Sequence, residues 1–103
     1  MKPTVYIVQK PDQNKNILSA QRYGDFLFLL PNGSSLTWRP EETVKRIRSQ
    51  LIGFNDEDYL LLIGDPAAIG VCTAIAAEYN QGRVKFLKWD NREYQYYPVE
   101  VTI

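Results

Sequence analysis

The stretch that decides the fold runs from Leu61 to Gly70 and reads LLIGDPAAIG. It begins as an apolar strand, turns at a glycine and continues as a helix of small side chains. Asp65 is a favourable N-cap residue, and Pro66 suits the first position of a helix. A buried strand that leads directly into a capped helix is typical of proteins in which strands and helices alternate.

Other segments rich in β-branched, aromatic or leucine residues also predict strands. Together with 59–63, the predicted strands are 4–9, 25–30, 84–89 and 93–103. The second and third strands are apolar without polar alternation, which predicts a sheet covered on both faces. Helices are predicted over 16–23, from Pro40 to a stop at Gly53, and from Pro66 to a stop at Gly82.

This order of elements predicts a small doubly wound α/β domain with a mostly parallel five-stranded sheet and three helices. We expect the strand order 2-1-3-4-5. The last strand should be antiparallel to the fourth, because only the segment 90–92 separates them. Pro98 places the last strand at an edge, since proline cannot donate to a ladder. The alternative is an α+β sandwich in which Phe26–Leu30 and Ser34–Trp38 form a hairpin.

Composition limits the function. The 103 residues fit a single domain over 1–103, and the twelve basic and twelve acidic side chains cancel, which argues against a general nucleic-acid binder. The absence of histidine excludes Ser-His-Asp and Cys-His catalysis within these residues. We expect no metal ligand set and no cofactor. One cysteine and the lack of a long apolar run predict a cytoplasmic protein that does not enter a membrane.

A crevice is predicted where the strand order reverses, outside the carboxyl ends of the first and third strands. Gln9 and Lys10 would line one side, and Gly64 and Asp65 the other. Because the N–H groups at a helix start attract anions, these residues are candidates for a nucleotide or phosphoester site. Against this, a capping Asp65 would repel phosphate, and the glycine spacing matches neither GxGxxG nor the P-loop. The simpler interpretation is that Asp65-Pro66 only starts a buried helix.

Two further features have ordinary structural interpretations. Cys72 lies in the middle of the uncharged helix and is expected to be buried and unreactive. The acidic run 56–58 precedes the third strand, and we expect a solvated loop there rather than a cation site.

The distribution of charge and aromatic residues suggests interaction surfaces. Residues 1–50 carry a formal charge of +4 and residues 51–103 a charge of −4. Arg46 and Arg48 on the helix after Pro40 are candidates for docking an acidic partner. Tyr94 and Tyr96 are predicted on the outer face of the last strand, where they could serve a protein interface, pair across strands or, with Trp89, stack nucleic-acid bases. The opposite, buried face would hold Tyr97, Val99, Val101 and Ile103.

Three segments together resemble a group of small tailed-phage proteins found in phages of cyanobacteria and other marine bacteria. They read DYLLLIGDPAAIG over 58–70, GRVKFLKWD over 82–90 and YPV over 97–99. The likeness covers about half of the chain, from Asp56 to Val99. It implies a phage accessory protein that acts in the host cytoplasm, and it implies no catalytic residue.

The leading hypothesis is therefore a non-enzymatic accessory protein that binds a host or phage protein. The alternative is a nucleotide- or phosphoester-binding domain, possibly an enzyme, centred on Gly64 and Asp65. The third hypothesis is single-stranded nucleic-acid binding, which the neutral net charge disfavours. A homodimer formed by pairing of edge strands is also a candidate assembly.

Overall fold

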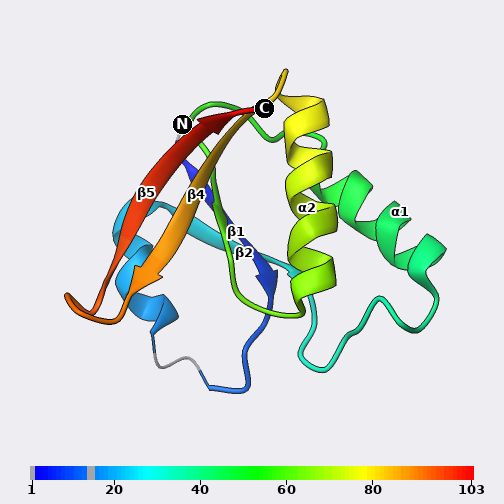
Figure 1. The fold of residues 1–103 in the computed structure, drawn as a ribbon, viewed down its shortest axis with the longest axis horizontal. Helices are drawn as coiled ribbons and strands as arrows, with labels where there is room; N and C mark the ends of the chain where they lie inside the picture. The colour runs from blue at the N-terminus through cyan, green and yellow to red at the C-terminus, as the bar shows by residue number, and fades with distance from the viewer. Residues whose placement is uncertain (1, 14–15) are drawn as a thin grey trace.

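A computed structural model describes residues 2–13 and 16–103 and arranges their five strands in one sheet (Figure 1). The strands are β1 (Thr4–Gln9), β2 (Asp25–Leu30), β3 (Tyr59–Leu61), β4 (Arg83–Asp90) and β5 (Gln95–Thr102). Their order is β2-β1-β3-β4-β5, with parallel pairing except between β4 and β5. The predicted topology is confirmed. The hairpin alternative is wrong, because β2 pairs in parallel with β1 and residues 34–38 do not form a strand.

The helices cover both faces of this sheet, as a doubly wound fold requires. The α-helices α1 (Pro40–Leu51) and α2 (Pro66–Tyr79) pack on one face, and the short 3-10 helix η1 (Ile17–Tyr23) packs on the other (Figure 1). Within the described part of the chain, no helix is long and apolar enough to cross a membrane.

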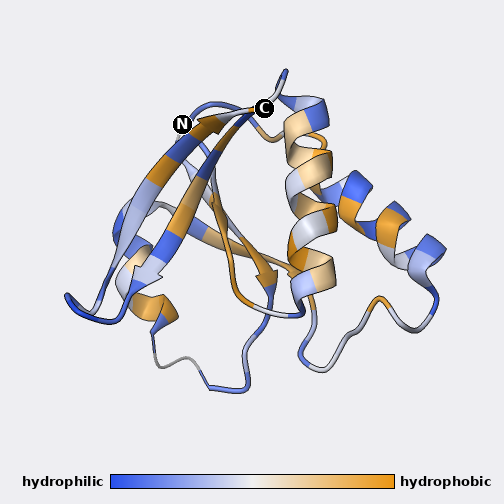
Figure 2. Ribbon diagram, viewed as in Figure 1, coloured by the Kyte–Doolittle hydropathy of each residue, from blue (hydrophilic) through white to orange (hydrophobic). Residues whose placement is uncertain are grey.

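The core accordingly has two layers. Ile47 and Leu51 of α1 and Cys72 of α2 are fully buried against the sheet face that carries Val8 and Leu60. On the other face, Ile17 and Ala20 of η1 pack against side chains of β1, β3 and β4. Adjacent residues of β1 and β3 thus enter different layers, which explains why these strands do not alternate apolar and polar residues (Figure 2).

The burial of β5 corrects the sequence prediction. Tyr96 is 4% exposed and packs in the η1 layer, so its predicted exposure is wrong. The predicted burial of Tyr97, Val99 and Ile103 is wrong as well, because these side chains are exposed, while Val101 is only partly buried. The physical reason is how far the helices on each face extend over the sheet. The helix α2 contacts β1 and β4, whereas η1 lies against β5, so the side of β5 that faces α2 is left largely open.

Pro98 lies in β5 at the edge of the sheet, as predicted. Its partner in β4 is Leu87, whose carbonyl accepts a hydrogen bond from Leu62 N on the opposite side. Leu87 and Pro98 therefore form a non-hydrogen-bonded pair, and the proline nitrogen faces the free edge. An edge strand that lacks a donor at its centre is a poor template for another strand. This arrangement opposes a homodimer built by pairing two β5 strands.

Candidate functional site

The four residues predicted to line the crevice do meet at the carboxyl ends of β1 and β3. The side chain of Gln9, only 9% exposed, fills the space between these ends. Its Oε1 accepts a hydrogen bond from Asp65 N at 2.8 Å. Its Nε2 donates to Ser34 O at 2.6 Å and more weakly to Pro31 O at 3.4 Å. The crevice is thus occupied by the protein's own side chain.

Asp65 occupies the start of α2, as the sequence predicts. Its Oδ1 accepts a hydrogen bond from Ala67 N at 3.3 Å, so it is the N-cap of the helix. Its Oδ2 accepts from Leu36 N at 3.4 Å in the loop after β2. A carboxylate in this position takes up the helix N–H groups and repels phosphate.

Gly64 allows the close approach of Gln9. Its φ is +128°, a conformation that L side chains rarely adopt, and a Cβ placed there would lie 2.5 Å from Cβ of Gln9. Lys10 is exposed, and its Nζ lies 5.8 Å from the ring centroid of Phe28. Gln9, Lys10 and Gly64 help to line a hollow of about 260 Å³ that remains open at these strand ends.

Beside the filled crevice lies the surface that we call the Trp38 surface, made of Trp38, Arg39, Glu42 and Arg46. It borders a hollow of about 430 Å³ between the loop after β2 and the first turns of α1. The Trp38 side chain is 77% exposed, the most exposed large hydrophobic residue together with Ile103 in the part of the chain that the structure describes. Arg39 forms an ion pair with Glu42 at an N–O distance of 3.5 Å. Arg46 is not part of this pair.

The sequence pattern indicates Arg46 as a candidate but not Trp38. The available signal was a tryptophan outside any apolar run, in the polar segment Ser34–Pro40 next to an arginine. Arg48, the second basic candidate, does not reach this surface. It forms a two-bonded ion pair with Glu78, with a shortest N–O distance of 2.6 Å, and so joins α1 to α2.

The two tyrosine candidates, Tyr94 and Tyr96, differ in their exposure. Tyr94 precedes β5 in a left-handed conformation, with φ of 52°, and is 76% exposed. Trp89 makes edge contacts with both Tyr94 and the buried Tyr96, at centroid distances of 6.3 and 5.1 Å. Burial raises the pKa of Tyr96 above its ordinary value. At the tip of the β4–β5 hairpin, Trp89, Lys88, Arg92 and Tyr97 help to line a hollow of about 440 Å³.

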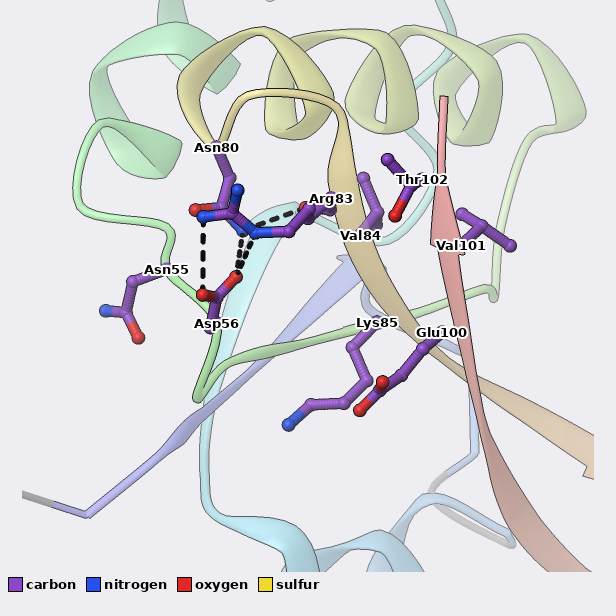
Figure 3. A pocket seen from close by; sticks show the side chains of 9 residues that line it. All are labelled: Asn55, Asp56, Asn80, Arg83, Val84, Lys85, Glu100, Val101 and Thr102. Atoms are coloured by element: carbon purple, nitrogen blue, oxygen red, sulfur yellow. Dashed lines mark hydrogen bonds and ion pairs between the residues drawn. The ribbon is translucent and has the colours of Figure 1, made fainter.

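At the opposite end of the sheet, the acidic run 56–58 is used within the molecule. Asp56 accepts hydrogen bonds from Arg83 Nε and Asn80 Nδ2, each at 2.9 Å (Figure 3). Asp58 is buried and accepts from Thr4 N at 3.0 Å and Asn55 N at 3.1 Å. Asp56 and Glu57 are exposed, as expected for a solvated loop, but Asp56 and the buried Asp58 also connect this loop to β4 and β1.

The contacts of Asp56 at this end of the sheet predict that the free energy of unfolding depends on pH. The hydrogen bonds from Arg83, and then from Asn80, lower the pKa of Asp56 below its ordinary value of 3.8. Because the folded-state pKa is lowered, the stabilisation is complete above the unfolded pKa and is lost as the pH falls through the folded value. Urea unfolding measures the difference in the free energy of unfolding between wild type and Asp56→Asn. This difference should be constant from neutral pH to about pH 5 and should shrink below about pH 4.

The neighbouring exposed carboxylate provides the matched control. Glu57→Gln removes the same charge from the same turn without removing the contact to Arg83. An advantage over Asp56→Asn that stays constant down to about pH 2 would contradict the assignment, since protonation of Asp56 in the unfolded chain must already reduce the stabilisation there.

Cys72 is fully buried in the layer between α2 and the sheet. Burial raises the pKa of its thiol to about 12. The predicted burial is confirmed, and since the thiolate is the reactive form, we expect this thiol to be unreactive at neutral pH.

The fold and its carboxyl-end face define a small doubly wound α/β protein whose crevice is partly filled by Gln9. Residues 3–103 match the model of the phage Pam3 gp32-like protein family, so the chain belongs to this family of phage proteins. The resemblance to phage proteins is confirmed to that extent. No curated protein and no solved structure matches the chain.

Proposed function

We propose that the protein is a non-enzymatic docking module that binds another protein through the Trp38 surface. The observation that carries the proposal is the 77% exposure of Trp38 beside Arg46 at a surface hollow. Tryptophan and arginine are the side chains most often found at energetically dominant positions of protein interfaces. As a member of a phage family, the protein would act in the cytoplasm of the infected cell.

The contacts of Gln9 favour this function over nucleotide binding. A nucleotide at the crevice would face the carboxylate of Asp65, and the Gln9 side chain already takes part of the space there. Displacing Gln9 would also leave the carbonyl of Ser34 and the amide of Asp65, both partly buried, without these hydrogen bonds. The Trp38 surface, in contrast, binds a partner without breaking an internal contact of Gln9.

The charge of α1 favours an acidic partner. Arg39, Lys45 and Arg46 lie on or next to its exposed side, and Glu42 is already paired with Arg39. An acidic segment could pair with Arg46 while an apolar side chain packs on the Trp38 ring. Complementary charge of this kind speeds association and excludes unsuitable partners.

A charge reversal at Arg46 tests the proposal. Protein captured from a lysate of phage-infected cells, after nuclease treatment, should contain a stoichiometric partner with wild type and lose it with Arg46→Glu. We expect the Kd to rise by roughly tenfold or more at low salt and by less at high salt, because the lost interaction is ionic.

Lys88→Glu is the matched control, since it reverses an exposed charge at the β4–β5 hairpin. Retention of the partner by Lys88→Glu and its loss by Arg46→Glu would support docking at the Trp38 surface. The reverse pattern would place binding at the hairpin and would refute the proposal. Loss of binding on nuclease treatment would favour the hairpin as a stacking surface for nucleic acid.

A further inference from the structure

The side chain of Gln9 joins two segments that the sheet itself does not join. Its carbonyl oxygen holds Asp65 N at the start of α2, and its amide group donates to Ser34 O and Pro31 O in the loop after β2. The segment 31–39 leads from β2 to α1 and carries Trp38. One buried side chain therefore connects the turn after β3 to the loop that presents the Trp38 surface.

Besides the contacts with Gln9, the Leu36 side chain packs against the core, and Asn32 Nδ2 donates to Asp12 Oδ1. Ser34 N and Trp38 N donate to carbonyls within the loop itself, at 3.3 Å in each case. Leu36 N donates to Asp65 Oδ2 at 3.4 Å, and Asp65 N is in turn held by Gln9. Among the described hydrogen bonds, the links from residues 31–38 to the turn after β3 thus run through Gln9 and Asp65.

We propose that Gln9 is a positioning residue that holds the loop 31–39 in the conformation that binds the partner. The inference rests on the proposed docking function. Gly64 contributes to this positioning, because the absence of a Cβ there makes room for Gln9. A loop fixed before binding does not have to be ordered by the partner, which lowers the entropy lost on association.

The test is the variant Gln9→Glu, which keeps the size of the side chain and the oxygen that accepts from Asp65 N. Near neutral pH, the second carboxylate oxygen faces the carbonyls of Ser34 and Pro31, where the amide donated, and repels them. Heteronuclear amide NOE values of residues 32–38 should fall relative to wild type, which reports motion on the ps–ns timescale. Gln21→Glu, the same change at an exposed site on η1, should leave these values unchanged.

Acidification provides a readout that a purely structural loss would not give. When the introduced carboxyl is protonated, its O–H can again donate to Ser34 O. The NOE values of Gln9→Glu should then return toward those of wild type as the pH falls to about 4–5. In Gln9→Met, which has no donor at any pH, the loop should stay loose over the whole range.

Binding is measured separately, with a short fluorescein-labelled peptide of alternating aspartate and phenylalanine as the probe. We expect Gln9→Glu to bind the probe roughly threefold to tenfold more weakly than wild type at neutral pH. Unchanged NOE values in Gln9→Glu would overturn the positioning role. A loosened loop with undiminished binding, in the presence of weaker binding by Trp38→Ala, would overturn its link to docking alone. Binding that neither Trp38→Ala nor Arg46→Glu weakens would instead refute the docking function.

Discussion

Gly64→Ala is expected to lower the free energy of unfolding by about 2–4 kcal/mol. Two effects add. The φ of +128° at Gly64 strains any other residue, and the new Cβ would lie 2.5 Å from Cβ and 2.7 Å from Oε1 of Gln9. Gln9 cannot move away freely, because its amide is fixed at both ends by Ser34 O and Asp65 N. Urea unfolding followed by circular dichroism measures the loss.

Gly70→Ala is the matched control for this prediction. Gly70 lies inside α2, and a Cβ added there meets no atom within 4 Å. The same substitution should therefore raise the free energy of unfolding by about 0.5–1 kcal/mol, because alanine loses less backbone entropy in a helix. A loss below about 1 kcal/mol in Gly64→Ala would mean that the turn after β3 adapts and that Gln9 is not tightly held there.

The topology could be predicted because its determinants are local. Apolar strands without alternation require two covered faces, and the short link between β4 and β5 requires an antiparallel pair. Asp65 and Pro66 mark the start of α2 through hydrogen-bonding and steric rules that depend only on neighbouring residues. These features need no knowledge of how far each helix extends over the sheet.

The burial of β5 could not be predicted, because it depends on that extent. Alternation correctly separates Tyr96 from Tyr97 and Val99, but it does not say which set is covered. A seven-residue 3-10 helix, η1, covers the Tyr96 side, whereas the longer and more apolar α2 lies over β1 and β4. The more apolar set, Tyr97, Val99, Val101 and Ile103, was predicted to be buried, but its side of β5 is left largely uncovered.

The candidate site shows the same division between local and long-range information. The sequence brings Gln9, Gly64 and Asp65 to one crevice through the strand order alone. Whether Gln9 lines that crevice or fills it depends on Ser34, a residue 25 positions away that supplies the acceptor for its amide. No local pattern in the sequence encodes this contact.

The crevice and the Trp38 surface are therefore connected through the hydrogen bonds of Gln9 to the loop after β2. In many doubly wound proteins, the carboxyl-end crevice binds a ligand and the adjoining loops close over it. Here the Gln9 side chain lies in the crevice and donates hydrogen bonds to the loop after β2. This loop places Trp38 in solvent, a position that contributes little to folding because the indole is mostly hydrated. A binding role accounts for such an exposed indole, and it predicts a large effect of its removal.

Trp38→Ala is expected to weaken binding of the captured partner by roughly thirtyfold or more, equivalent to about 2 kcal/mol. The free energy of unfolding should change by less than about 0.5 kcal/mol, because the ring is 77% exposed in the free protein. Isothermal titration calorimetry with the partner gives the first quantity and urea unfolding gives the second. Ile52→Ala is the control, since Ile52 is 72% exposed just beyond the other end of α1.

The double variant Trp38→Ala with Arg46→Glu decides whether the two residues act at one site. If one partner segment contacts both side chains, the second substitution should cost less binding energy once the first is present. Strictly additive effects would instead place the two residues at separate contacts. If Ile52→Ala weakened binding as much as Trp38→Ala, the partner would bind along the whole exposed side of α1. Binding would then not be centred on the hollow beside Trp38.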